Sequence, residues 1–185
     1  MHPPPCYNES YIIEETVKHM HRIAEFMPVS RAQFEKDWEF QQPCPYDELK
    51  MPRRATAGSA GYDFYAPIDF TLEPGETIKL PTGVRAKIDE GWVLMILPRS
   101  GQGFKFRVQL YNTAGVIDSD YFGAANEGHI FVKLINANHE GKTLSVKKGE
   151  AFAQGIFLPF GITVDDEADA VRTGGFGSTS QEAKA

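Results

Sequence analysis

Two carboxylates stand two residues apart in the segment GVIDSDY, which covers residues 115–121. Asp118 and Asp120 fall on the same side of an extended chain, where their like charges repel each other. Two solvated aspartates in an exposed turn are therefore one interpretation. A carboxylate beside a substrate phosphate can also act as a general base toward water, and Tyr121 adds a flat surface for a sugar. On its own, the segment is compatible with both interpretations.

The stretch RTGGFGSTS, residues 172–180, sets one arginine and one phenylalanine among glycines and hydroxyl residues. Its composition alone favours a flexible terminus. Yet successive glycine N–H groups can wrap a phosphate, Arg172 can add a forked cation, and Phe176 can stack on a base. The stretch is therefore also a candidate for closing over a nucleotide.

Three further segments carry polar groups next to apolar strands. PRSG, residues 98–101, is either a plain turn or a place where its cation and hydroxyl meet a phosphate. AGSAGYD, residues 57–63, is typical of a tight loop that enters a strand. GEAFAQ, residues 149–154, is typical of a turn and a buried strand, in which Gln154 needs a hydrogen-bond partner.

The composition is that of one globular domain with an appendage. The 185 residues are 42% hydrophobic and 24% charged, with a net charge of −6. This acidity argues against a nucleic acid polymer as ligand, whereas an anionic small molecule needs only a local group of cations. The longest apolar run, residues 92–97, is too short to span a membrane. Cys6 and Cys44 form no CxxC pair, so reduced thiols and a cytoplasmic location are expected.

The elements that must position these groups differ along the chain. An apolar stripe over residues 10–24 predicts a helix, and Ser30 with Gln33 predicts the start of a second helix over about 30–38. Residues 23–29 could instead be extended. From about residue 50, many short alternating runs separated by turns predict an all-β sandwich, barrel or jelly roll.

Five segments, taken in chain order, resemble the five motifs of the trimeric dUTP pyrophosphatase (dUTPase) family. The resemblance is to the Gram-positive bacterial and phage branch of that family. The segments are AGYDF at 60–64, PRSG at 98–101, GVIDSDYFG at 115–123, GEAFAQ at 149–154 and RTGGFGSTS at 172–180. The resemblance covers about residues 50–180. It implies a distorted jelly-roll β domain (51–165) and a flexible C-terminal arm (166–185), and the helical patterns before them predict a partly helical N-terminal extension (1–50).

The resemblance implies hydrolysis of dUTP to dUMP and pyrophosphate, which keeps dUTP out of DNA and supplies dUMP for thymidylate synthesis. Asp118 matches the carboxylate that activates the attacking water. Tyr121 matches the ring that packs under deoxyribose and excludes a 2′-hydroxyl, and Asn112 matches a residue that helps to bind uracil. The other implied substrate-binding residues are Arg99, Ser100, Gly101, Gly115, Ile117, Gln154, Arg172, Phe176, Gly177, Ser178 and Thr179.

The resemblance further implies a homotrimer in which each active site is shared between subunits, with the fifth motif supplied by a neighbour. Mg²⁺ is the implied cofactor, held by the triphosphate and waters with Asp63 nearby. This agrees with the absence of metal-ligand spacing, since His129 and His139 stand alone in the sequence. The cytoplasm of a bacterium or of a phage-infected host is the implied location.

Departures from the family pattern and two rival functions accompany the resemblance. About five extra residues, 124–128, lie in the hairpin that should hold uracil, and the first fifty residues lie mostly outside the matched region. One rival is the related dCTP deaminase, whose strand after the third motif carries a Glu, whereas residues 130–136 offer only Lys133 as an ionisable side chain. The other is a nucleotide-dependent regulatory protein that meets a partner through the extension or the extra residues.

Overall fold

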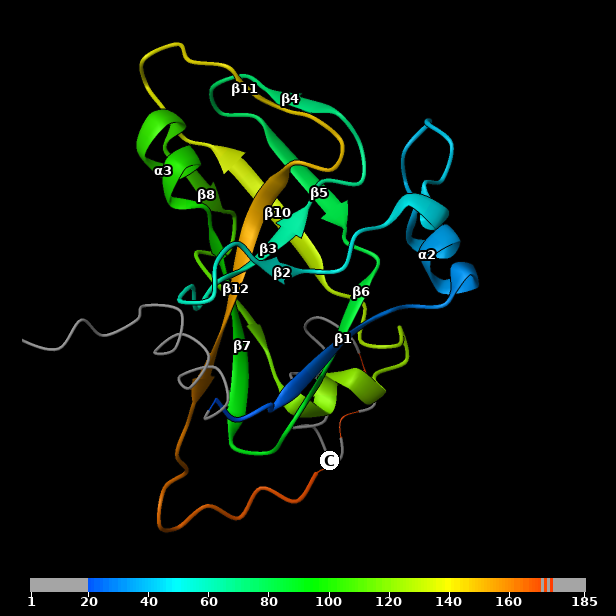
Figure 1. Cartoon of the computed structure of the whole chain (residues 1–185), viewed down its shortest axis with the longest axis vertical. Helices are drawn as coiled ribbons and strands as arrows, with labels where there is room; N and C mark the ends of the chain where they lie inside the picture. Colours follow the sequence, from blue (N-terminus) through cyan, green and yellow to red (C-terminus); the bar gives the residue numbers. More distant parts are fainter. Residues whose placement is uncertain (1–19, 171, 173, 175–185) are drawn as a thin grey trace, which may run out of the picture.

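The computed structural model describes residues 20–170 together with Arg172 and Gly174, and these residues form a predominantly β-stranded domain (Figure 1). Its strands are β1 (Ala24–Pro28), β2 (Arg53–Arg54), β3 (Tyr62–Tyr65), β4 (Phe70–Leu72), β5 (Thr77–Pro81), β6 (Val84–Ile88), β7 (Trp92–Pro98), β8 (Val108–Leu110), β9 (Gly115–Ile117), β10 (Phe131–Asn136), β11 (Leu144–Val146) and β12 (Ala151–Pro159). Its helices are α2 (Arg31–Asp37), α3 (Ser100–Phe106) and the 3₁₀ turns η1 (Tyr46–Glu48) and η2 (Ser119–Gly123). The all-β fold predicted from the sequence is confirmed.

A five-stranded antiparallel sheet carries most of the motif segments, in the order β2-β3-β12-β7-β9. A three-stranded sheet, β5-β10-β8, and two strand pairs, β4-β11 and β1-β6, complete the β structure of the described residues. Alternating apolar side chains from these strands meet in one core, where Phe64, Leu94 and Phe152 are fully buried. The sheets therefore hold the ends of the motif strands in fixed relative positions.

Residues 24–37 pack on this domain through a strand pair and a capped helix. β1 runs antiparallel to β6, with Ala24 opposite Ile88 and Pro28 opposite Val84. The alternative of an extended segment over residues 23–29 is confirmed by β1. The helix predicted over residues 10–24 is wrong over residues 20–24, where the chain is irregular and then pairs with β6, and residues 1–19 lie outside the described part. The second predicted helix is confirmed as α2, whose N-cap Ser30 accepts a hydrogen bond from the Gln33 N–H at 3.1 Å.

One helix was missed by the sequence interpretation. Residues 98–101 were expected to form a turn or a strand end, but Arg99 is the N-cap of α3, which begins at Ser100. Two glycines within SGQGFKF lower its helix propensity, so tertiary structure decides its conformation.

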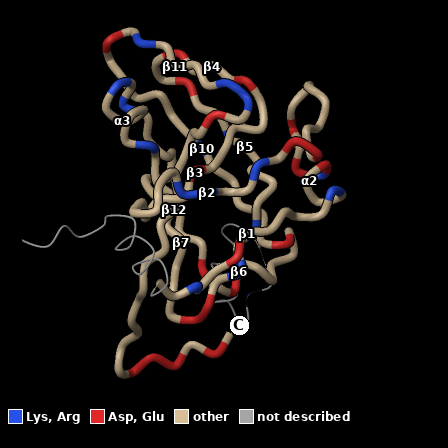
Figure 2. Tube along the Cα trace, viewed as in Figure 1, with Lys and Arg blue, Asp and Glu red and all other residues tan. Residues whose placement is uncertain are grey.

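Acidic residues follow one another in the extended chain after β12, at 165–167 and 169, as the red segments of Figure 2 show. None of the helices in the described part of the chain is long and apolar enough to cross a membrane.

Candidate active site

A polar cavity of about 350 Å³ opens beside the five-stranded sheet. Its lining residues come from the loop before β3, from β3 itself, from the start of α3 and from β12, and they are Ala55, Ser59, Gly61, Asp63, Arg99, Ser100, Gly101, Gln102 and Gln154. Strand register explains this convergence, because Gln154 of β12 pairs with Asp63 of β3 on one side and with Leu97 of β7 on the other. Three of the five motif segments therefore meet in this cavity, which we term the phosphate cavity.

Arg99 supplies the cation of the phosphate cavity. Its Nε lies 3.1 Å from Asp63 Oδ1, and its Nη1 donates a long hydrogen bond to the Ala151 carbonyl at 3.4 Å. The Arg99 side chain remains 41% exposed and that of Asp63 only 18%. The carboxylate thus orients the guanidinium while leaving donors available for an anionic ligand.

Gln154 is held in the phosphate cavity by close packing against the backbone. Its Nε2 donates to the Pro98 carbonyl at 3.0 Å, which supplies the partner that the sequence demanded. Its Oε1 lies only 2.7 Å from the position that a Cβ on Gly61 would occupy. Gly61 is therefore needed for the close approach of the loop before β3 to β12.

A second cluster joins the paired carboxylates to the C-terminal segment. Arg172 donates from Nη2 to Asp118 Oδ2 at 2.7 Å and from Nε to Asp120 Oδ1 at 2.8 Å. Its guanidinium carbon lies 5.8 Å from the centre of the Tyr121 ring. Asp118 is extended and η2 begins at the next residue, yet both carboxylates face one cation as their spacing suggested. Arg172 thereby offsets the repulsion between them.

Tyr121 presents a fixed ring. The residue is only 3% exposed, and its hydroxyl donates to the His129 carbonyl at 2.8 Å. Burial raises the pKa of the Tyr121 phenol above its ordinary value of 10.0. The hydroxyl therefore stays protonated at neutral pH and holds the ring in one orientation.

Within one chain the phosphate cavity and the Asp118 cluster are separate. Both regions are attached to β7, but at different positions along it. Gln154 of β12 pairs with Leu97 of β7, whereas Ile117 of β9 pairs with Leu94, three residues earlier on the same strand. That offset is about 10 Å along the strand, and Asp118 lies one residue further away. One chain accordingly does not bring the Asp118 and Asp120 carboxylates against the side chains of the phosphate cavity.

A third feature is a more apolar cavity of about 400 Å³ next to the hairpin between β8 and β9. Six residues line it: Lys79, Tyr111, Asn112, Asn126, Phe131 and Lys133. The Lys133 ammonium lies 3.9 Å from the centre of the exposed Tyr111 ring, and Lys79 lies 5.1 Å from that of Phe131. We term this cavity the base cavity. It combines two amide side chains with aromatic walls, and this lining suits a flat polar ring.

A family model described as dUTPase matches residues 47–180. The chain belongs to the dUTPase family. The "Deoxyuridine 5'-triphosphate nucleotidohydrolase" of Lactococcus lactis subsp. lactis is 41% identical over 134 residues, which are 71% of this chain and 88% of that protein. The protein of the same name from Hahella chejuensis is 44% identical over 142 residues, or 72% of this chain and 88% of that protein.

Solved structures support the same assignment. The crystal structure of dUTPase from Streptococcus mutans has a TM-score of 0.56 and 31% identity, and the match covers 75% of this chain and 97% of that one. A dUTPase from phage phi11 of S. aureus, solved to visualise a species-specific insert, has a TM-score of 0.57 at 20% identity, with 80% and 96% coverage. The second likeness is one of fold alone.

Several residues expected from the family motifs stand outside these clusters. Gly115 and Ile117 are buried backbone positions of β9. Phe176, Gly177, Ser178 and Thr179 lie outside the described residues. Conversely, the sequence interpretation assigned no role to Asn126, and it held His129 to be isolated, whereas the structure buries His129 completely and pairs it with Asp37. His129 and Asp37 are 92 positions apart in the sequence, so no local pattern reveals their contact.

Proposed function

We propose that this chain hydrolyses dUTP to dUMP and pyrophosphate. The observation that carries the proposal is the convergence of Asp63, Arg99 and Gln154, from three of the family's motif segments, on one phosphate cavity. A triphosphate needs several cations and donors there, because the chain as a whole carries a net charge of −6. We assign the cytoplasm of a bacterium or of a phage-infected cell, where the nucleotide pool lies, as the site of action.

Asp118 is the proposed general base. Its side chain is 48% exposed and bound to Arg172, so it can reach a water molecule without the cost of burying an unpaired charge. The water gives its proton to Asp118 as its oxygen attacks the α-phosphorus. The bond from that phosphorus to the bridging oxygen then breaks, and pyrophosphate leaves with the bond's electrons.

Arg172 then has two successive partners in the proposed cycle. Without nucleotide it neutralises Asp118 and Asp120, at 2.7 and 2.8 Å. A terminal phosphate with two negative charges competes for the same guanidinium. Transfer of Arg172 to the phosphate would release Asp118 to act on water and would stabilise the leaving pyrophosphate.

The residues present fit a magnesium ion that is carried by the substrate. In the described part of the chain, no group of three or more His, Cys, Asp or Glu side chains could hold a metal. Asp63 nevertheless brings one carboxylate oxygen into the phosphate cavity, which suits an ion held mainly by phosphate oxygens and water. When bound, Mg²⁺ would neutralise charge on the triphosphate.

We propose a homotrimer with shared active sites, which the separation of two site regions within one chain supports. Asp118 and the phosphate cavity must meet at one α-phosphorus, but they lie roughly 10 Å or more apart along the sheet. The segment after β12 also exposes large apolar side chains, with Ile162 75% exposed and Val164 fully exposed. A neighbouring chain would cover these side chains and could bring its own Asp118 to this chain's phosphate cavity.

Selectivity for a deoxyuridine nucleotide is assigned to the base cavity and Tyr121. Tyr121, whose ring is locked in place, is the residue proposed to pack under the sugar and to exclude a 2′-hydroxyl. Asn112 in the β8–β9 hairpin provides an amide that can bind uracil, and a close fit excludes the methyl group of thymine by steric clash.

The proposed function is tested by pyrophosphate release from dUTP, dCTP, dTTP and UTP in parallel, with and without Mg²⁺. Magnesium-dependent cleavage of dUTP alone is the expected result. Ammonia release from dCTP would instead reveal a deaminase, and no turnover of any of the four would contradict the proposal.

A further inference from the structure

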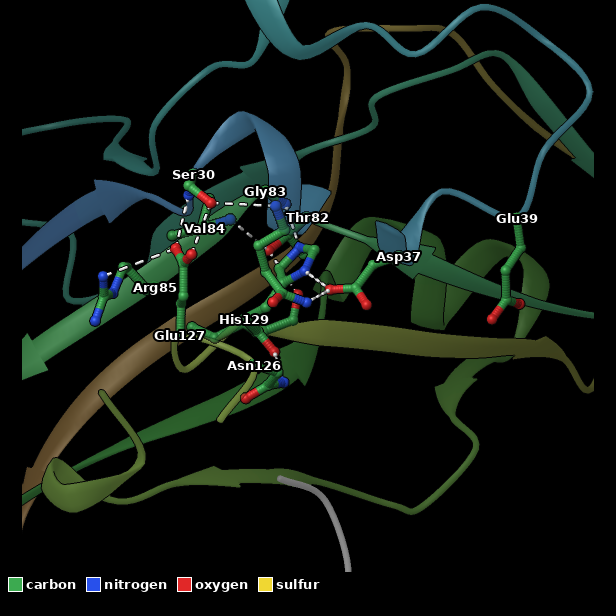
Figure 3. Close-up of polar contacts among 12 residues, drawn as sticks. Ser30, Asp37, Glu39, Thr82, Gly83, Val84, Arg85, Asn126, Glu127 and His129 are labelled. Carbon is green, nitrogen blue, oxygen red and sulfur yellow. Dashed lines mark hydrogen bonds and ion pairs between the residues drawn. The ribbon is translucent and has the colours of Figure 1, made fainter. Parts of the chain in front are cut away.

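The segment outside the family's motif region reaches the edge of the base cavity. After β1, the chain turns at Ser30 into α2, and α2 lies against the loop of residues 124–129, the pocket loop (Figure 3). The two surfaces suggested by the sequence as partner sites, the N-terminal extension and the extra residues of the hairpin, therefore contact each other.

The first contact joins Ser30 to Glu127. The backbone N–H and the hydroxyl of Ser30 donate to the two carboxylate oxygens of Glu127 at 2.7 and 2.6 Å, and Arg85 lies 4.0 Å from the same carboxylate. These hydrogen bonds lower the pKa of Glu127. Glu127 has a φ of 59°, a left-handed conformation that costs about 1–2 kcal/mol for a residue with a side chain. The contact with Ser30 helps to hold it there.

The second contact joins Asp37 to His129. The Gly83 N–H donates to His129 Nε2 at 2.8 Å, so Nε2 is the unprotonated nitrogen. Nδ1 therefore carries the hydrogen and donates it to Asp37 Oδ2 at 2.6 Å. Gln33 also donates to this carboxylate, at 2.7 Å. A fully buried imidazole is thereby fixed by the last residue of α2.

Asn126 lies next to both contacts and lines the base cavity with Asn112. Its Nδ2 donates to the Tyr121 hydroxyl at 2.8 Å and makes a longer contact with the His129 carbonyl at 3.4 Å. Because the Tyr121 hydroxyl already donates to that carbonyl, the amide nitrogen must face these two oxygens. The Asn126 Oδ1 is then left buried without a hydrogen-bond partner. A buried acceptor without a partner costs about 1–3 kcal/mol, a cost that a ligand donor would remove.

We propose that Asn126 is a specificity-determining residue for the nucleoside and that Ser30 and Asp37 are positioning residues that hold it. This rests on the proposed function, which makes the nucleoside of dUTP the occupant of the base cavity. The deoxyuridine part of dUTP has two hydrogen-bond donors, the N3–H of the base and the 3′-hydroxyl of the sugar, and Asn126 Oδ1 accepts from one of them. The N-terminal segment thus takes part in substrate binding without touching the substrate.

The test compares four variants of the full chain: Asn126→Ala, Ser30→Ala, Asp37→Ala and, as a control on the same helix, Glu35→Gln. The Glu35 side chain is 53% exposed, and its recorded ion pair is with Arg31 on the same helix. The first three are expected to raise the KM for dUTP about tenfold, the effect of one lost hydrogen bond, with kcat within about twofold of wild type. Inhibition by pyrophosphate should be unchanged in all four, and Glu35→Gln should match wild type.

A conservative variant separates positioning from general destabilisation. Asp37→Asn keeps an oxygen that can accept from His129 Nδ1, so its KM for dUTP should lie close to the wild-type value and well below that of Asp37→Ala. Thermal unfolding of each variant shows that assays are run on folded protein. If KM and pyrophosphate inhibition worsened together, or if Asp37→Asn behaved like Asp37→Ala, the positioning role would be overturned.

Analogues of the substrate identify the donor. If Asn126 binds the 3′-hydroxyl, Asn126→Ala should weaken binding of dUMP but not of its 3′-deoxy analogue; if it binds N3–H, both should weaken. Unchanged binding of both would overturn the proposal. Normal dUTP turnover with unchanged KM in the variants would overturn this proposal alone, whereas no dUTP turnover by the wild-type chain would overturn it together with the proposed function.

Discussion

The phosphate cavity and the base cavity differ in how some of their polar side chains are held in place. The phosphate cavity takes Asp63 and Gln154 directly from paired strands of one sheet. The base cavity instead takes Asn126 from a loop that contains two residues with positive φ, Glu127 and Gly128. That loop is fixed by side chains from α2, about ninety residues earlier in the chain.

This difference separates what the family supplies from what this chain adds. The dUTPase family match begins at residue 47, so it includes every residue that lines the phosphate cavity but not Ser30 or Asp37. We infer that phosphate binding is fixed by the common sheet. Nucleoside binding, in contrast, also depends on an element outside the family match.

Of all the changes proposed for the two regions, replacing Asp118 should reduce activity the most. Asp118→Asn keeps the shape but removes the base, so kcat should fall roughly thousandfold, while calorimetric binding of dUTP persists. Asp120→Asn is the matched control, because Asp120 also binds Arg172 but is not the proposed base. Near-normal turnover by Asp118→Asn, or equal losses in the two variants, would contradict the assignment.

Gly128→Ala should destabilise the pocket loop that carries Asn126 into the base cavity. A Cβ there would lie 2.6 Å from the Tyr121 carbonyl oxygen and 2.8 Å from the Phe122 Cα, at a φ of 70°. We expect a loss of about 2–4 kcal/mol in the free energy of unfolding, from overpacking and backbone strain together. Urea denaturation measures this loss.

Gly141→Ala measures the cost of backbone strain without overpacking. Gly141 has nearly the same φ, 71°, with nothing within 4 Å of its Cβ position, so its alanine variant should lose only about 1–2 kcal/mol. Equal losses at the two glycines would mean that the pocket loop is not tightly packed against η2.

Gly61→Ala should weaken ligand binding in the phosphate cavity, with a smaller effect than the changes above. The new Cβ displaces the end of Gln154, a flexible group, so stability should change little while the KM for dUTP and the inhibition constant for pyrophosphate rise up to about tenfold. Gly58→Ala, with open space around its Cβ position, should behave as wild type. Unchanged pyrophosphate inhibition in Gly61→Ala would show that Gln154 is dispensable there.

The smallest effect concerns pH. Burial lowers the pKa of His129 below its ordinary value of 6.5, although Asp37 and Glu127 oppose this shift. Below pH 6.5 the unfolded chain therefore binds more protons than the folded one, and the free energy of unfolding falls as the pH drops toward the lower folded pKa.

His129→Gln removes this proton, so its stability should depend less on pH between about 7 and 5. His139→Gln, at an exposed position, should follow the wild-type profile. Urea denaturation at several pH values provides the measurement, and identical profiles for all three proteins would contradict the pKa shift.

The sequence predicted what local pattern and family motifs encode. Short alternating runs after residue 50 correctly predicted an all-β domain, and the Ser30 cap correctly predicted the start of α2. Of the two alternatives around Ala24, the extended segment over residues 23–29 is confirmed and the helix is wrong there, because pairing with Ile88 overrides the helical pattern.

For the site, the motifs identified the residues of the phosphate cavity, but not their distance from Asp118. That distance depends on strand register between β7, β9 and β12. Nor could any local pattern connect Ser30 to Glu127, which are 97 residues apart.

The most direct test of the account mixes two inactive variants, Asp118→Asn and Arg99→Ala, unfolded together and refolded as a mixed oligomer. If Asp118 of one subunit serves the phosphate cavity of another, random assembly leaves about one quarter of the sites with both wild-type residues. We therefore predict that pyrophosphate release from dUTP returns to about that fraction of wild-type activity. Mixed oligomers that stay as inactive as either variant alone would contradict a site shared between subunits.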